Sequence, residues 1–312
     1  MSDLPSSPRP DPRPSVSGVA TLDLHHLETP GAICSYLLET PEPTLVDPGP
    51  ATTLEALLEG VRGTGLDPTD LRHLLLTHVH LDHAGAAGHL AQMLPKLAVH
   101  VHEDGAPHMA DPERLVASTR RTFGEEHDRF WGEVVPVPRN QLRGWRPGET
   151  SPVPGIRPLH TPGHIDHHLA WEAEDLGVLF TGDSLGILLH LEGPSHPATP
   201  PPSVNLAAWE ETLTQTLAPV EVDAFGAAHF GFHPDLHGRR RQLLDRLRGL
   251  AQRVRQAMGK GPEAEEEDAR AFQAESVALH VPVLGETRAR KYFSTFSARK
   301  DWEGMRFHLA RL

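Results

Sequence analysis

The stretch THVHLDHAG, residues 77–85, places three imidazoles and one carboxylate within six positions, directly after an apolar run at residues 74–76. A short apolar run followed by polar residues, Ala and Gly predicts a buried strand that ends in a loop leading into a helix. Imidazole and carboxylate ligands suit zinc and neighbouring transition metals. Because a catalytic ion keeps one position open, four such groups in one loop indicate two ions. These candidate ligands are His78, His80, Asp82 and His83.

The amino-acid composition argues against several classes of partner and metal site. The 312 residues include 29 Lys and Arg against 42 Asp and Glu, a net charge of -13, which disfavours nucleic acid as a partner. A single cysteine, Cys34, excludes a disulfide framework and a thiolate metal site, whereas 22 histidines are unusually many. No run is long enough to cross a bilayer. We expect a cytoplasmic protein that acts on a small molecule without a membrane or nucleic-acid partner, and a homodimer is compatible with this expectation.

The apolar patterns predict alternating strands and helices. Residues 1–15, rich in Pro and Ser, are expected to form a disordered leader. Strands are expected at 16–24, 33–39, 44–46, 74–76, 97–101, 156–159, 169–171 and 178–180, and helices at 54–61 and 239–258. Residues 103–146 read as a helical insertion of the kind that forms a lid, and 194–202 as an irregular proline-rich loop. The pattern from 277 to 312 is mixed.

Further candidates follow other apolar runs. The motifs HTPGH at 160–164, TGDS at 181–184 and AHFG at 228–231 supply His164, Asp183 and His229, and Asp47 ends the short strand at 44–46. His167 and His168 are adjacent, and we assign them a possible role in a substrate pocket. Ser184 has no identifiable base and is interpreted as a loop-capping residue.

In order and spacing these motifs resemble those of the metallo-β-lactamase superfamily, over roughly residues 16–235. The resemblance implies an α+β fold, an αββα sandwich of two mixed sheets, with the metals at one edge. The catalytic domain would span 16–238, with 239–312 as a C-terminal helical extension. The resemblance assigns His78, His80 and His164 to one ion and Asp82, His83 and His229 to a second. Asp183 would bridge both ions, and Asp47 would orient a ligand.

The implied chemistry is hydrolysis of an ester, thioester or lactone by a metal-bridging hydroxide, with Asp82 as the catalytic residue that passes a proton to the leaving group. Two Zn²⁺ ions are expected, and iron or manganese would also suit these ligands. The motifs are similar to those of the glyoxalase II and lactonase-like branch. Neither tyrosine, Tyr36 or Tyr292, stands at an evident equivalent of the lactonase tyrosine. Two alternatives stay open: a mononuclear iron persulfide dioxygenase and a metal-binding scaffold without turnover.

Overall fold

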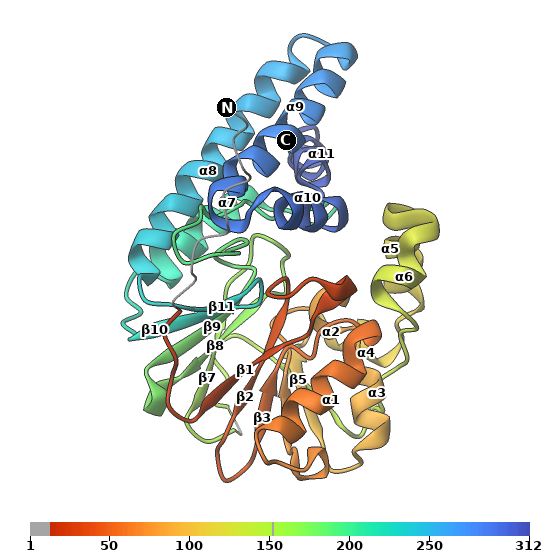
Figure 1. The fold of residues 1–312 in the computed structure, drawn as a ribbon, viewed down its shortest axis with the longest axis vertical. Coiled ribbons are helices and arrows are strands. Elements are labelled where there is room, and N and C mark those ends of the chain that lie inside the picture. The colour runs from red at the N-terminus through yellow and green to blue at the C-terminus, as the bar shows by residue number, and fades with distance from the viewer. Residues whose placement is uncertain (1–12, 152) are drawn as a thin grey trace, which may run out of the picture.

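A computed structural model describes residues 13–151 and 153–312, and the predicted leader lies mostly outside this range. Two mixed sheets face each other (Figure 1). The first has the order β1 (Val19–Asp23), β2 (Cys34–Leu38), β3 (Thr44–Val46), β4 (His73–Leu75), β5 (Ala98–His102) and β6 (Leu142–Trp145). The second has the order β11 (Gly231–His233), β10 (Ala224–Ala227), β9 (Val178–Gly182), β8 (Leu169–Ala173) and β7 (Ile156–His160).

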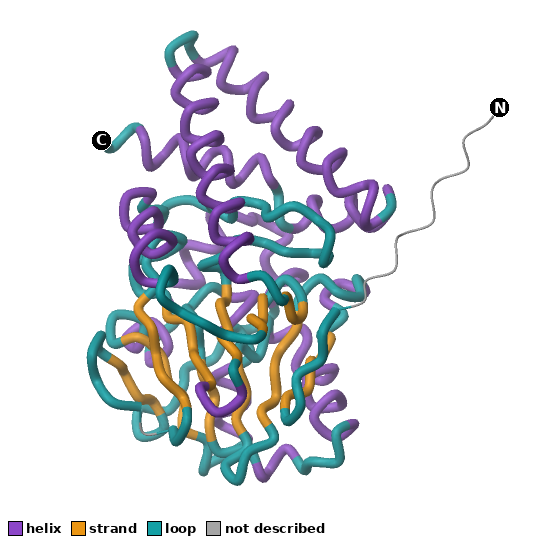
Figure 2. The backbone as a smooth tube through the Cα atoms, turned by 90° about the vertical axis from the view of Figure 1, so that its left-hand side faces the viewer, coloured by secondary structure: helices purple, strands orange, loops and turns teal. Residues whose placement is uncertain are grey.

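Helices cover the outer faces of the sheets and one end of the sandwich (Figures 1 and 2). Those of the first half are α1 (Leu54–Gly63), α2 (Leu81–Ala84), α3 (Ala87–Met93), α4 (Ala106–Ala110), α5 (Glu113–Phe123) and α6 (His127–Trp131). Those of the second half are α7 (Leu206–Glu211), α8 (Leu236–Met258), α9 (Pro262–Leu284), α10 (Glu286–Thr295) and α11 (Ala298–Leu309). Short 3-10 turns are η1 (His26–Glu28), η2 (Ala51–Thr53), η3 (Pro68–Asp70), η4 (Gly124–Glu126) and η5 (Glu174–Leu176), and η6 (Thr212–Thr216) is a π-helical turn.

Three apolar layers hold the sandwich together. Side chains such as Tyr36, Trp171 and Phe180 form the layer between the sheets. A second layer lies between the first sheet and its helices, and a third packs the second sheet against α7 and α8. Every position of β2 is buried, and its one strongly polar side chain, Ser35, donates to the Val46 carbonyl at 3.0 Å. The predicted α+β sandwich with a C-terminal helical region is confirmed.

The C-terminal helices form a bundle against one end of the sandwich (Figure 1). In α8 the residues Leu243, Leu247, Leu250 and Val254 are buried, as their helical spacing predicts. Phe293 of α10 belongs to the same apolar layer as the helices of the first sheet, so this bundle packs against the sandwich itself. None of the helices in the described part of the chain is both long and apolar enough to span a bilayer.

The region predicted as a helical insertion, 103–146, is only partly helical. It contains α4, α5, η4 and α6, but Leu142–Trp145 forms β6 and pairs in parallel with β5. Four residues with one apolar position at each end carry too little pattern to predict a strand. The sheet edge therefore includes a strand from a segment in which we expected helical pieces and no strand.

Candidate metal centre and active site

Five loops bring the candidate ligands to one edge of the sandwich. The strands β3, β4, β7, β9 and β10 each end just before the segment that carries Asp47, residues 78–83, His164, Asp183 or His229. Parallel neighbours such as β3, β4 and β9, β10 end on the same side, which is why residues distant in the sequence meet there. The fold brings the seven candidate ligands together at this edge.

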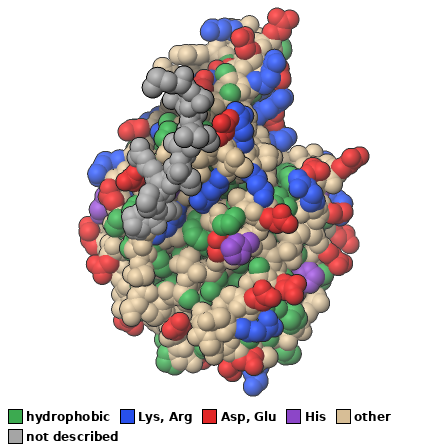
Figure 3. All heavy atoms as spheres, in the orientation of Figure 1, with side chains coloured by type: hydrophobic (Ala, Val, Ile, Leu, Met, Phe, Trp, Pro, Cys, Tyr) green, Lys and Arg blue, Asp and Glu red, His purple; other side chains and the backbone are tan. Residues whose placement is uncertain are grey.

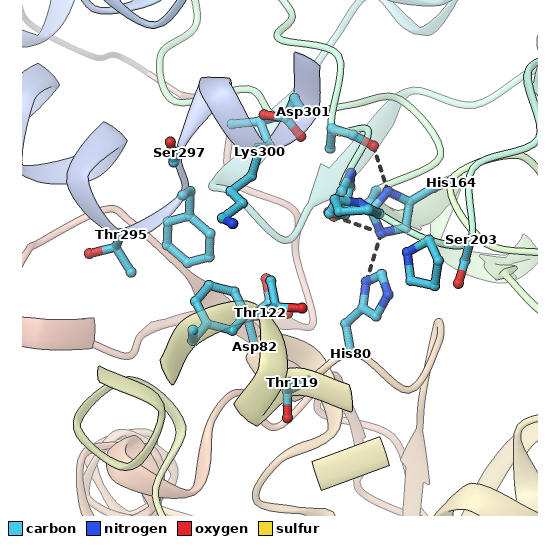
Figure 4. Close-up of a pocket in the computed structure, with 18 of the residues that line it drawn as sticks. His80, Asp82, Thr119, Thr122, His164, Ser203, Thr295, Ser297, Lys300 and Asp301 are labelled. Atoms are coloured by element: carbon cyan, nitrogen blue, oxygen red, sulfur yellow. Dashed lines mark hydrogen bonds and ion pairs between the residues drawn. The ribbon is translucent and has the colours of Figure 1, made fainter. Parts of the chain in front are cut away.

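The first cluster consists of His78, His80 and His164, whose candidate ligand atoms lie within 4.8 Å of one another. The Nδ1 atom of His80 lies 3.0 Å from Nε2 of His78. It also lies 2.8 Å from Nε2 of His164 (Figure 4). Burial, together with the neighbouring His164, lowers the pKa of His80 to about 3. Neutral imidazoles offer lone pairs, so three of them converging on one point form a nitrogen site for a divalent cation.

The second cluster consists of Asp82, His83 and His229, also within 4.8 Å, and Asp183 lies between the two clusters. The Asp183 carboxylate is 3.4 Å from Nε2 of His83, 3.7 Å from Nε2 of His229 and 3.5 Å from Nε2 of His164. Asp183 therefore reaches histidines of both clusters. This is the position that a carboxylate bridging two ions requires.

Unpaired buried atoms and buried charge both favour a cation at this edge. His83 Nε2, His229 Nε2 and Asp183 Oδ1 are buried without a hydrogen-bond partner in the described structure. Burial raises the pKa of Asp82, but the charges of His83 and His229 outweigh it and the pKa ends below its ordinary value. Burial lowers the pKa of His83, yet Asp183 and Asp82 draw it well above the usual range. A set of imidazole nitrogens and carboxylate oxygens with unpaired buried atoms fits a pair of divalent ions.

Asp47 holds the loop and one ligand in place. Its Oδ1 accepts a hydrogen bond from the Thr77 backbone N–H at 2.8 Å, and its Oδ2 accepts one from the Thr77 hydroxyl at 2.7 Å. The same Oδ2 lies 2.9 Å from Nδ1 of His83. This bond fixes the orientation of the His83 ring, so that Nε2 faces the cluster, where it could bind a metal ion. The geometry is that of the orienting residue predicted from the sequence.

A peptide group orients His164. Its Nδ1 donates to the Ala198 carbonyl at 2.7 Å, and the N–H of the same peptide, on Thr199, donates to Asp301 Oδ1 at 2.7 Å. Asp301 Oδ2 also contacts His196 Nε2 at 2.9 Å. The peptide between Ala198 and Thr199 is thus held between a candidate ligand and helix α11. Sequence analysis missed this link because the tail showed no readable pattern.

Tyr292 of α10 lies beside the second cluster. Its hydroxyl is 3.0 Å from His229 Nδ1, which also contacts the Ala32 carbonyl at 3.1 Å. From the sequence, neither tyrosine was an evident counterpart of the lactonase tyrosine. In the structure Tyr292 contacts the side of the His229 ring that faces away from the second cluster, and it does not line the pocket. Its side chain is buried. The tyrosine therefore helps to fix the orientation of His229.

Family comparison agrees with this geometry. The family model described as the metallo-beta-lactamase superfamily matches residues 29–253. The chain belongs to this superfamily. A metallo-beta-lactamase family protein of Thermus thermophilus has a solved structure with a TM-score of 0.65 and 27% identity, covering 89% of this chain and 93% of that one.

Two curated relatives in the superfamily have named activities. A hydroxyacylglutathione hydrolase of Xylella fastidiosa is 32% identical over 45% of this chain and 40% of the relative. An atrochrysone carboxyl ACP thioesterase of Pseudocercospora fijiensis is 29% identical over 42% of this chain and 31% of the relative. The chain spans less than half the length of either.

Two glycines explain parts of the superfamily motifs in this chain. At Gly163, where φ is 142°, a Cβ would lie 2.2 Å from the Cβ of Trp209, so only glycine lets the loop before His164 pass that side chain. At Gly182, where φ is 48°, a Cβ would lie 2.5 Å from the Thr77 hydroxyl. Close approach at these points brings the His164 and Asp183 loops against the loop at residues 78–83.

His167 and His168 do not line the pocket, in contrast to the role we predicted for them. The Nε2 of His168 accepts from the Asp183 backbone N–H at 3.2 Å, and its Nδ1 is 2.8 Å from the Thr161 hydroxyl, so its ring is committed to holding the Asp183 loop. His167 is buried beside His108, with their ring centroids 6.3 Å apart. Adjacent residues point apart, and here neither points into the pocket.

A pocket opens directly on the ligand clusters. His80, Asp82, His164, Asp183 and His229 lie in its wall. The remaining lining comes from α5 and α6, from the loop around residues 198–203 and from the start of α11, as Figure 4 shows for the labelled residues. The predicted lid and the C-terminal helices thus both contribute to the wall. Figure 3 shows few histidines on the face it presents, in keeping with the burial of many of them.

Proposed function

We propose that this protein is a metal-dependent hydrolase of an ester or thioester, with two divalent ions held by the two clusters and Asp183 between them. The observation that carries the proposal is the convergence of unpaired histidine and carboxylate atoms at the wall of one pocket. Two divalent ions in such a site supply an activated water and polarise the scissile carbonyl. The named activities of the two relatives, a thioesterase and a hydroxyacylglutathione hydrolase, support acyl transfer to water.

The side chains around the ions have distinct tasks in this proposal. His78, His80 and His164 would offer ring nitrogens to one ion, and Asp47 keeps His83 directed at the other. Asp82 lines the pocket, and its carboxylate lies 3.4 Å from Nε2 of His229. An ionised carboxylate in the pocket wall is placed to accept a proton from water and to return it to the leaving group.

The test compares metal-free and metal-loaded protein. Full-length protein stripped with a chelator is assayed against thioesters, aryl esters and lactones, and then assayed again after zinc, iron or manganese is restored. We expect hydrolysis that disappears with the chelator and returns with about two ions per chain. Equal hydrolysis by the stripped protein would contradict the proposal. Oxygen uptake on a persulfide with one iron per chain would also contradict it.

A further inference from the structure

Away from the ligand clusters the pocket is lined by aromatic, aliphatic and proline side chains together with several Ser and Thr residues, and most of its exposed wall is apolar. Phe123, Trp131, Ile187 and Phe296 line it together with the prolines at 200–202. Apolar walls of this kind favour the binding of a hydrocarbon group, because both apolar surfaces are removed from water. The pocket therefore suits a substrate with an apolar acyl group.

Lys300 is the one lysine or arginine among the described residues that line this pocket. It lies in the first turn of α11, and Figure 4 shows its ammonium end reaching into the pocket, on the side opposite His80. Its ion pair with Glu303, at 3.3 Å, joins two partly exposed side chains three residues apart on one helix. Such surface pairs are weak, so an anion in the pocket can compete for the ammonium group.

The carboxylates of the pocket wall do not neutralise Lys300. Asp82 and Asp183 belong to the ligand clusters, where the proposed ions balance their charge. Asp301, next to Lys300 in the chain, has one oxygen on the Thr199 N–H and the other on His196. Among the described residues, Lys300 is thus the one cationic side chain in the pocket wall that faces the ligand clusters.

The other basic residues of the tail are directed elsewhere. Arg288 donates to the Gly31 carbonyl at 3.0 Å, Lys291 donates to the Glu28 carbonyl at 2.9 Å, and Arg290 pairs with Glu286. None of these three lines the pocket. A thiol partner with several carboxylates, such as a peptide thiol, would find only one cation here.

We propose that Lys300 binds an anionic group of the substrate, and that the substrate is an ester or thioester with an apolar acyl chain and a single anionic group. This inference rests on the proposed hydrolase function. The apolar chain would lie along Phe123, Trp131 and Phe296, the scissile carbonyl would face the ligand clusters, and the anion would pair with Lys300. An ion pair between Lys300 and one charged group of the substrate changes mainly the affinity of the enzyme for that substrate, so we expect its effect in KM.

The test uses two thioesters that differ only in charge. Metal-loaded full-length protein is assayed with the octanoyl thioester of 3-mercaptopropionate and with the octanoyl thioester of its neutral amide. The variants are Lys300→Gln and Lys300→Glu. The matched control is Lys260→Gln, which removes the same charge from an exposed lysine in the turn between α8 and α9.

In wild type and in Lys260→Gln we expect the charged thioester to be preferred in kcat/KM. In Lys300→Gln this preference should fall about five- to tenfold, mainly through KM, because a partly exposed charged hydrogen bond is lost. Lys300→Glu should reverse the preference. Octanoylglutathione, which carries two carboxylates and an ammonium group, should be a poorer substrate than the mercaptopropionate thioester.

The results distinguish an error in the proposed substrate class from an error in the proposed hydrolase function. If the metal-loaded wild type hydrolyses neither thioester nor any ester of the panel, the proposed function is wrong. If it hydrolyses both thioesters but the charge preference is the same in Lys300→Gln as in wild type, the substrate class is wrong and the hydrolase remains. Circular dichroism of each variant shows whether it is folded, and Lys300 is exposed enough that we expect all of them to fold.

Discussion

The peptide held between His164 and Asp301 gives the sharpest prediction about how the C-terminal helices serve the metal site. In Asp301→Ala the Thr199 N–H and His196 Nε2 lose their partners within a buried contact. Each unsatisfied buried group costs about 1–3 kcal/mol, so the loss of two partners should lower the free energy of unfolding by roughly 2–6 kcal/mol. The freed peptide no longer holds the Ala198 carbonyl against Nδ1 of His164.

Loss of the partner that orients a ligand weakens metal binding by about 10- to 100-fold. Because Asp301 acts through one peptide group, we expect the lower end, about tenfold or 1.4 kcal/mol, for one of the two ions. Asp301→Asn keeps an acceptor for the Thr199 N–H and should restore most of this affinity. Metal content measured by mass spectrometry, after dialysis against a series of chelator concentrations, reports the affinity, and urea unfolding of the metal-free protein reports the stability.

Thr199→Val is the matched control. It removes the hydroxyl that donates to the Asp301 backbone carbonyl at 2.8 Å but leaves the carboxylate contact with the Thr199 N–H. We expect it to lower stability by about 1 kcal/mol and to leave both ions bound as in wild type. If Asp301→Ala is destabilised yet keeps both ions with wild-type affinity, the peptide does not orient His164 and this reasoning is wrong.

Three further changes have expected results. Asp47→Ala removes the acceptor of His83 Nδ1 and should weaken binding of one ion by about 10- to 100-fold in the same dialysis series, whereas unchanged affinity would contradict an orienting role. In Gly304→Ala the new Cβ would lie 1.8 Å from a loop carbonyl, so urea unfolding should show a loss of about 1–3 kcal/mol. In Gly249→Ala, in the middle of α8, the new Cβ has no neighbour among the described residues within 4 Å outside its own turn of the helix, so the free energy of unfolding should rise by about 0.5–1 kcal/mol. Equal effects of the two glycine changes on stability would contradict the close approach of α11 to the loop at Thr199.

The local sequence predicted the elements that carry the candidate ligands because each is short and self-contained. The run 74–76 followed by His78 and His80 signals both a buried strand and a donor set, whatever the rest of the chain does. The spacing of Leu243, Leu247 and Val254 likewise predicts α8 by itself. Each of these features can be recognised from a short stretch of consecutive residues.

Other features depend on distant partners and were not predictable. The strand β10 reads AFGA, which shows neither alternation nor a long apolar run, and it becomes a strand because β9 and β11 flank it. Tyr292 and its partner His229 are 63 positions apart, and Asp301 and Thr199 are 102 apart. No local pattern marks a side chain that matters only through such a contact. The substrate pocket could not be predicted from the sequence for the same reason, because its lining comes from distant segments.

The claim beneath every proposal above is that two ions are bound where the clusters converge. Crystals of the full-length protein grown with zinc, measured at wavelengths on both sides of the zinc absorption edge, locate such ions directly. The account predicts two anomalous peaks, one bonded to His78, His80 and His164 and one bonded to Asp82, His83 and His229, with Asp183 between them. Zinc elsewhere on the chain, with these side chains unliganded, would contradict it.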